Sequence, residues 1–166
     1  MAKLVTGLFK SRVAAEAAVD ALLKRGYTRD DISVLMSDAT KNKEFAIETG
    51  SRAADGAGIG GAVGGAVGAV VAAIVAVGTT IALPGIGLVI AGPIAAALAG
   101  AGAGGAAGGL IGALVGAGIP EYRAKVYDAG LRSGGILIGV EGNSDDESDK
   151  LEKLMEELGA DNVRQE

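Results

Sequence analysis

The chain has 166 residues, a formal net charge of −5 and 49% hydrophobic residues, but only three Tyr, two Phe and no Trp. It contains no Cys and no His, which excludes disulfides and thiolate metal sites and removes the commonest general base and metal ligand. The length allows one or two domains, and the acidic balance lacks the basic footprint of a nucleic-acid-binding protein. Residues 1–10 show no signal-peptide pattern, so we expect an intracellular protein.

Residues 1–54 predict the first half of a folded domain. Lys3–Phe9 is predicted as a strand, Ser11 caps a helix that follows it, and Ile32–Ser37 is predicted as a second strand. A strand, a crossover helix and a second strand make a unit whose two strands run parallel. The polar residues 38–54 are predicted to be a loop or a partial helix.

Residues 55–119 predict a hydrophobic helical hairpin. Residues 56–120 contain no Asp, Glu, Lys or Arg, and 20 of the 29 glycines and all three prolines lie among them. The pattern predicts one helix over 55–78, a break over 79–92 and a second helix over 93–118. At about 1.5 Å per residue, each helix is long enough to cross a hydrocarbon core of about 30 Å.

The glycines of this segment are regularly spaced. They recur at every fourth residue, which places them on one face of a helix and lets another helix approach closely. We expect this glycine face to be a helix-packing surface, and its members are Gly56, Gly60, Gly64, Gly68, Gly100, Gly104, Gly108, Gly112 and Gly116.

Residues 120–166 predict the second half of the domain. Pro120 opens a short helix that ends at Gly130, and Ile136–Val140 is predicted as a third strand. Ser144 and Glu147 match a capping box for a last helix, and residues 161–165 are predicted as a short fourth strand.

The two halves mirror each other, and each is too small to form a core alone. Joined, they predict an α+β fold: a ferredoxin-like four-stranded sheet with helices on one face, formed by both chain ends and split by the long helical hairpin.

Three stretches of this sequence resemble a known family. They are Gly26–Leu35 (GYTRDDISVL), Gly118–Tyr122 (GIPEY) and Gly130–Leu137 (GLRSGGIL), with the apolar glycine-rich segment between the first and the second. The pattern resembles the general stress protein 17M-like family, also described as heat-induced stress proteins of the YflT type. The resemblance implies a bacterial stress-associated protein, and it supplies no catalytic residues.

Motifs that would carry chemistry are weak. Two matches to Gly-x-Gly-x-x-Gly begin at Gly56 and Gly100, but neither directly follows a predicted strand, so helix packing is favoured over a dinucleotide site. An acidic run could bind a hard cation, but negative charge in the first turn of a helix favours capping; the run is Asp145, Asp146, Glu147 and Asp149. We therefore expect no catalytic, cofactor-binding or metal-binding residues.

Cations and tyrosines flank the apolar segment. The cations either meet anionic lipid headgroups or form a solvated face, and both interpretations stay open; they are Arg52, Arg123, Lys125 and Arg132. Tyr122 and Tyr127 either lie at a membrane interface or pack under the sheet.

Three hypotheses for function follow. We favour a non-enzymatic, stress-associated protein that attaches to or inserts in the bacterial cytoplasmic membrane through its hairpin, with both termini on the cytoplasmic side, and that self-associates. The alternative is a lipid-independent cytoplasmic homo-oligomer, a ring, filament or shell with the hairpins as its apolar interior. Both require self-association, because a monomer would expose too much apolar surface. The third hypothesis, an enzyme or a small-molecule sensor, is supported only by analogy with other proteins that have such a sheet. The expected partners are thus other copies of the chain and membrane lipid, with no nucleic acid and no cofactor.

Overall fold

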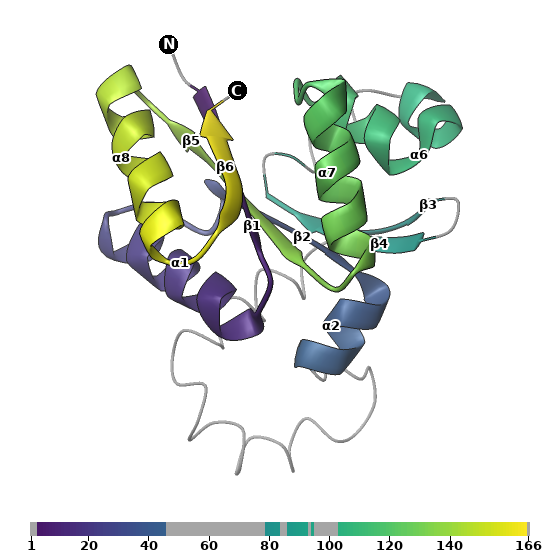
Figure 1. Cartoon of the computed structure of the whole chain (residues 1–166), viewed down its shortest axis with the longest axis horizontal. Coiled ribbons are helices and arrows are strands. Elements are labelled where there is room, and N and C mark those ends of the chain that lie inside the picture. Colours follow the sequence, from purple (N-terminus) through teal and green to yellow (C-terminus); the bar gives the residue numbers. More distant parts are fainter. Residues whose placement is uncertain (1–2, 46–78, 84–85, 93, 95–102, 166) are drawn as a thin grey trace.

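The computed structural model describes residues 3–45, 79–83, 86–92, 94 and 103–165, and these residues form a sheet with helices on both of its faces (Figure 1). The elements run in the order β1 (Lys3–Phe9), α1 (Arg12–Lys24), β2 (Ile32–Ser37), α2 (Asp38–Phe45), β3 (Thr79–Leu83), β4 (Ile86–Ala91), α6 (Ala103–Gly116), α7 (Glu121–Arg132), β5 (Ile136–Gly142), α8 (Asp145–Glu157) and β6 (Asp161–Gln165). The predicted α+β class is confirmed. The predicted helix over 55–78 lies outside the described residues.

The sheet has six strands in the order β3-β4-β2-β5-β1-β6. Every neighbouring pair is antiparallel. Because β1 and β2 both pair with β5, they run parallel to each other, as a strand, crossover helix and strand require. Strands from both chain ends therefore lie side by side in one sheet, and the first and last strands, β1 and β6, are paired neighbours (Figure 1).

One face of the sheet is covered by α1 and α8. The buried face of α1 consists of Ala15, Ala18, Val19 and Leu22. On α8, the buried apolar residues are Leu151 and Met155. These side chains pack against alternate residues of the strands, among them Val5, Phe9, Ile32, Val34, Met36, Ile136, Ile138 and Val140. Alternate residues face this side because successive side chains of a β-strand point to opposite faces of the sheet.

The opposite face is covered by α7 and the described part of α6. Leu8, Leu35 and Leu137 point to this side, where they pack with Leu110 and Leu114 of α6. The expectation of helices on one face only is therefore wrong. Since β1, β2 and β5 carry buried residues at consecutive positions, both faces of the sheet require a cover, as in strands with near-continuous apolar runs.

The predicted helix break at 79–92 is confirmed in the described residues, but they form a β-hairpin rather than a turn between two helices. β3 pairs with β4 from Thr79↔Ile90 to Leu83↔Ile86, and β4 pairs with β2. Two apolar runs rich in Thr, Ile and Val, separated by Pro84 and Gly85, are a hairpin signal that the helical interpretation overlooked. The hairpin extends the four strands of the chain ends to six.

The chain crosses β2 closely after β4. Gly92 has φ +87°, and a Cβ there would overlap the carbonyl oxygen of Ile32 and lie 2.7 Å from the Cα of Ser33. Two residues later, the backbone N–H of Ile94 donates to the Ser33 hydroxyl at 3.0 Å, and the Ile94 side chain is buried. Gly92 thus brings the chain from the sheet edge onto its second face.

The second predicted helix, over 93–118, is not one unbroken helix. Within α6, Gly109 has φ 63° and ψ −156°, which interrupts the helical backbone. The shorter helix after Pro120 is confirmed as α7, but it continues past Gly130 to Arg132. Gly130 instead packs tightly on Leu8, where a Cβ would overlap that side chain.

Candidate functional site

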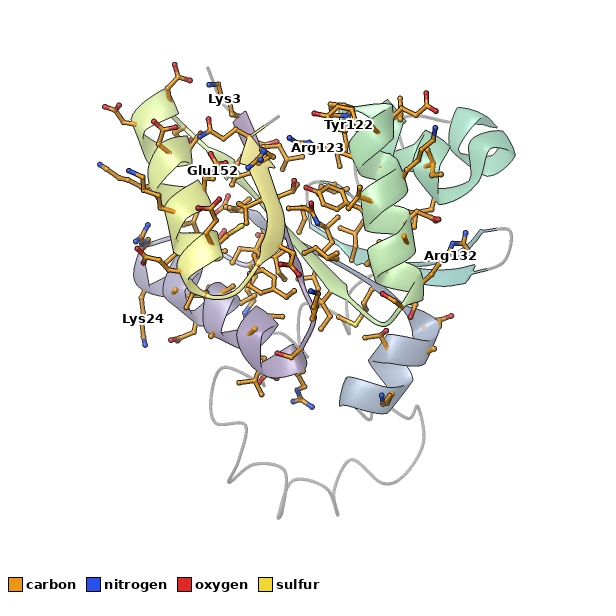
Figure 2. All side chains as sticks on the ribbon, in the orientation of Figure 1. Lys3, Lys24, Tyr122, Arg123, Arg132 and Glu152 are labelled. Carbon is orange, nitrogen blue, oxygen red and sulfur yellow. The ribbon has the colours of Figure 1, made fainter. Side chains whose placement is uncertain are left out.

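The cations expected near a membrane lie along α7. Lys125 pairs with Glu121 at 2.8 Å, and Arg132 pairs with Asp128 at 2.9 Å. The Arg123 guanidinium lies 5.6 Å from the centre of the Tyr122 ring. Figure 2 shows Arg123 at one end of α7 and Arg132 at the other, so the helix spreads these cations along its length rather than gathering them. Arg52 lies outside the described residues.

Exposed apolar side chains accompany these cations. Among the described residues, the large apolar side chains that are exposed are Val13, Val115, Tyr122 and Val126. Val115 lies in the last turn of α6, and Tyr122 and Val126 lie one turn apart on α7, where residues four apart are neighbours. Tyr122 is 67% exposed. The outer side of α7 therefore mixes apolar and cationic groups, and the last turn of α6 adds the exposed Val115.

The inner side of α7 fixes the helix to the sheet. Ala124, Tyr127 and Leu131 are fully buried. The Tyr127 hydroxyl lies 2.8 Å from the Thr6 hydroxyl of β1 and donates to the carbonyl oxygen of Asn162 in β6 at 2.9 Å. Of the two positions considered for the tyrosines, Tyr127 packs under the sheet and Tyr122 faces outward.

The glycine face is only partly within the described residues. Gly104 and Gly108 precede the interruption of α6 at Gly109, and Gly112 and Gly116 follow it. These four glycines thus do not share one straight helix. The pairing of the glycine face with another helix stays a prediction, and its remaining members, Gly56, Gly60, Gly64, Gly68 and Gly100, lie outside the described residues.

The acidic run at 145–149 begins α8. The Glu147 N–H donates to the Ser144 hydroxyl at 3.2 Å, and the Glu147 carboxylate accepts from the Asn143 N–H at 2.9 Å. The predicted capping box is therefore confirmed, except that the Glu147 side chain bonds to the N–H of Asn143 and not to that of Ser144. In the described part of the chain, no group of three or more Asp or Glu residues is arranged to hold a metal ion.

The turn after α1 meets the start of α8. The Tyr27 hydroxyl donates to the Glu147 carboxylate, a contact across 120 residues that no local pattern predicts. The hydrogen bonds from Tyr27 and Asn143 lower the pKa of Glu147. Burial and the Glu147 carboxylate raise the pKa of the Tyr27 phenol, so Tyr27 keeps its proton and acts as the donor.

A polar hollow opens beside this contact. It has a volume of about 320 Å³ and is lined by Arg25, Gly26, Tyr27, Asp31, Glu141, Asn143 and Glu147. A second hollow of about 520 Å³ adjoins it across Tyr27 and Glu147, where Lys150 adds a further cation. The walls of both hollows carry carboxylates beside one or two cations, an arrangement suited to water and counter-ions.

No match to this chain was found among protein families, characterised proteins or solved structures. In addition, within the described residues none of the helices combines the length and apolar character needed to cross a membrane.

Proposed function

We propose that the chain is a non-enzymatic, stress-associated bacterial protein that attaches to a membrane and self-associates. The contact with lipid is made by the uncharged residues 56–78 together with the outer side of α6 and α7. One observation carries the proposal: three of the four exposed large apolar side chains among the described residues lie on α6 and α7, and two of these, Tyr122 and Val126, share α7 with its cations.

This mixture suits the interface between lipid headgroups and acyl chains. An interfacial helix buries its apolar side chains in that boundary and holds Lys and Arg near anionic headgroups. Tyr is favoured there because its ring is apolar and its hydroxyl is polar. Glu121 and Asp128 pair with Lys125 and Arg132, so we expect apolar contact to contribute more than charge.

The topology constrains how residues 46–78 meet the membrane. α2 ends at Phe45 directly after β2, and β3 begins at Thr79 in the same sheet. A single crossing would place β3 across the membrane from the sheet to which it belongs. Two helical crossings need about 40 residues, which is more than the segment offers. We therefore propose a segment that enters and leaves the bilayer on one side.

The chain ends serve as the soluble part of this arrangement. Their strand order β2-β5-β1-β6, with α1 and α8 as the connections, supports a ferredoxin-like unit. The β3–β4 hairpin and the α6–α7 layer would then be additions to that unit, one at its edge and one on its second face.

The test is flotation of the detergent-free protein with liposomes. We expect the wild type to rise with phosphatidylglycerol vesicles and to resist high salt. The double variant Tyr122→Ser with Val126→Ser should bind about tenfold less, because burying two such side chains contributes at least 1.4 kcal/mol. Val13→Ser is the matched control, since Val13 is 76% exposed on α1 and should leave binding unchanged.

Two outcomes would contradict membrane attachment. A discrete large particle that stays at the bottom of the gradient would support the lipid-independent scaffold instead. A stable monomer in the absence of lipid and detergent would contradict both self-association and the membrane proposal. Equal losses for the Val13 and Tyr122/Val126 variants would remove α7 from the lipid contact.

A further inference from the structure

The two edge strands of the sheet differ in how well they are protected from pairing with a strand of another chain. β6 forms one edge and carries Asp161 and Arg164, which pair with Lys10 and Glu152. Its register against β1 also shifts between Thr6 and Leu8. Charges and irregular pairing are the devices by which natural proteins keep an edge strand from pairing with another chain.

β3 forms the other edge and has neither device. It is the end of the strand order and pairs with β4 alone among the residues that the structure describes. Its five residues, Thr79, Thr80, Ile81, Ala82 and Leu83, contain no charge and no proline, and its pairing with β4 has no register shift. α6 contacts β3, but a helix adds no strand to the sheet.

We propose that β3 pairs with β3 of a second copy of the chain in an antiparallel, two-fold arrangement. An edge strand leaves backbone N–H and C=O groups that need partners, and another strand supplies them. A two-fold axis requires the same surface on both copies, which a strand paired with itself provides. The result is one sheet that continues through two molecules.

The length of β3 selects the register. Only the register with Ile81 opposite Ile81 of the partner copy pairs all five residues, because Thr80 then faces Ala82 and Thr79 faces Leu83. Any other two-fold register leaves residues of the strand unpaired. This inference rests on the proposed self-association and names the surface that carries it.

Cysteine cross-linking tests the register, since the natural chain has no Cys. In the Ile81→Cys variant, the two Cα atoms across the axis would lie about 4.5–5.5 Å apart, which is within disulfide range. In Thr79→Cys, they would be separated by four residues, about 13 Å along the strands. We expect copper–phenanthroline to convert most of the Ile81→Cys protein to a covalent dimer and little of the Thr79→Cys protein.

Arg164→Cys, on the exposed part of β6, is the control for random collision. Equal cross-linking of all three variants would overturn the β3 pairing. Self-association by light scattering without an Ile81 cross-link would also overturn it while leaving the proposed self-association intact. A monomer by light scattering, in the absence of lipid and detergent, would defeat self-association and with it the proposed function.

Discussion

At the scale of single residues, two glycines lie where neighbouring elements approach each other closely. Gly130 lies against Leu8 between α7 and the sheet, and Gly92 lies against Ile32 and Ser33 where the chain leaves β4. Neither role is visible in the sequence, where Gly130 is predicted to end a helix and Gly92 lies in a predicted helix break. What distinguishes them is the neighbouring backbone or side chain, which only the fold supplies.

We predict that Gly92→Ala is strongly destabilising. The residue has φ +87°, and an added Cβ would overlap the backbone of β2, which cannot move as a flexible side chain could. Gly26→Ala is the matched control, because Gly26 has φ +96° with nothing within 4 Å of the added Cβ.

Urea denaturation measures both effects. The control should lose about 1–2 kcal/mol, the cost of a left-handed backbone for an L-residue, and Gly92→Ala should lose clearly more, because the overlap adds to the same strain. Equal losses in the two variants would show that the close approach of Gly92 to β2 contributes nothing.

At the scale of elements, the sequence predicted those parts whose signals are local. The strands at 3–9, 32–37 and 161–165 and the caps at Ser11 and Ser144 are confirmed, because strand alternation and capping depend on a few adjacent residues. The sequence analysis predicts a break at 79–92 but not the β3–β4 hairpin, because Pro84 and Gly85 are interpreted there as a turn between two helices. The apolar runs on either side of them are the strands.

Contacts between elements that are distant in the chain could not be predicted from the sequence. Tyr27 and Glu147 are 120 residues apart, and only the capping pattern marked Glu147 at all. Likewise, the sequence leaves Tyr122 and Tyr127 open between a membrane interface and the sheet. Only the fold shows that Tyr127 is buried with Ala124 and Leu131, whereas Tyr122 is exposed.

We predict that the contact between Tyr27 and Glu147 makes stability depend on pH. The pKa of Glu147 is lower in the folded protein than in the unfolded chain, chiefly because Tyr27 donates to its carboxylate. A depressed pKa stabilises the fold above the unfolded value, about 4.3 for Glu, and the contribution is lost as the pH falls through the folded pKa.

The Glu147→Gln variant isolates this contribution. It should be less stable than the wild type at pH 7, and the difference should shrink as the pH falls below about 4.3, measured by urea denaturation at each pH. Glu156→Gln, an exposed position near the other end of α8, is the control. A difference between wild type and Glu147→Gln that stays constant with pH would contradict the role of the carboxylate charge.

At the scale of the whole molecule, the chain combines a conventional core with an uncharged segment of unusual composition. The core draws on residues from 5 to 36 and from 94 to 163, and the two layers of helices bury both faces of the sheet. Residues 56–78 contain no charged residue, and fifteen of these 23 residues are Gly or Ala, a composition that favours close backbone approach over a large-side-chain core. We therefore expect folding stability to lie in the layered sheet and the proposed membrane attachment to depend mainly on residues 56–78.

Replacing residues 56–78 by a Gly/Ser linker of equal length tests this division. We expect the variant to keep its cooperative unfolding, because the two described core clusters already bury both faces of the sheet with residues from 5 to 36 and from 94 to 163. It should lose most of its flotation with vesicles, while cross-linking through Ile81→Cys should persist, since β3 lies after the linker. Loss of cooperative unfolding would place the segment in the folding core, and undiminished flotation would leave the outer side of α6 and α7 as the sole lipid contact.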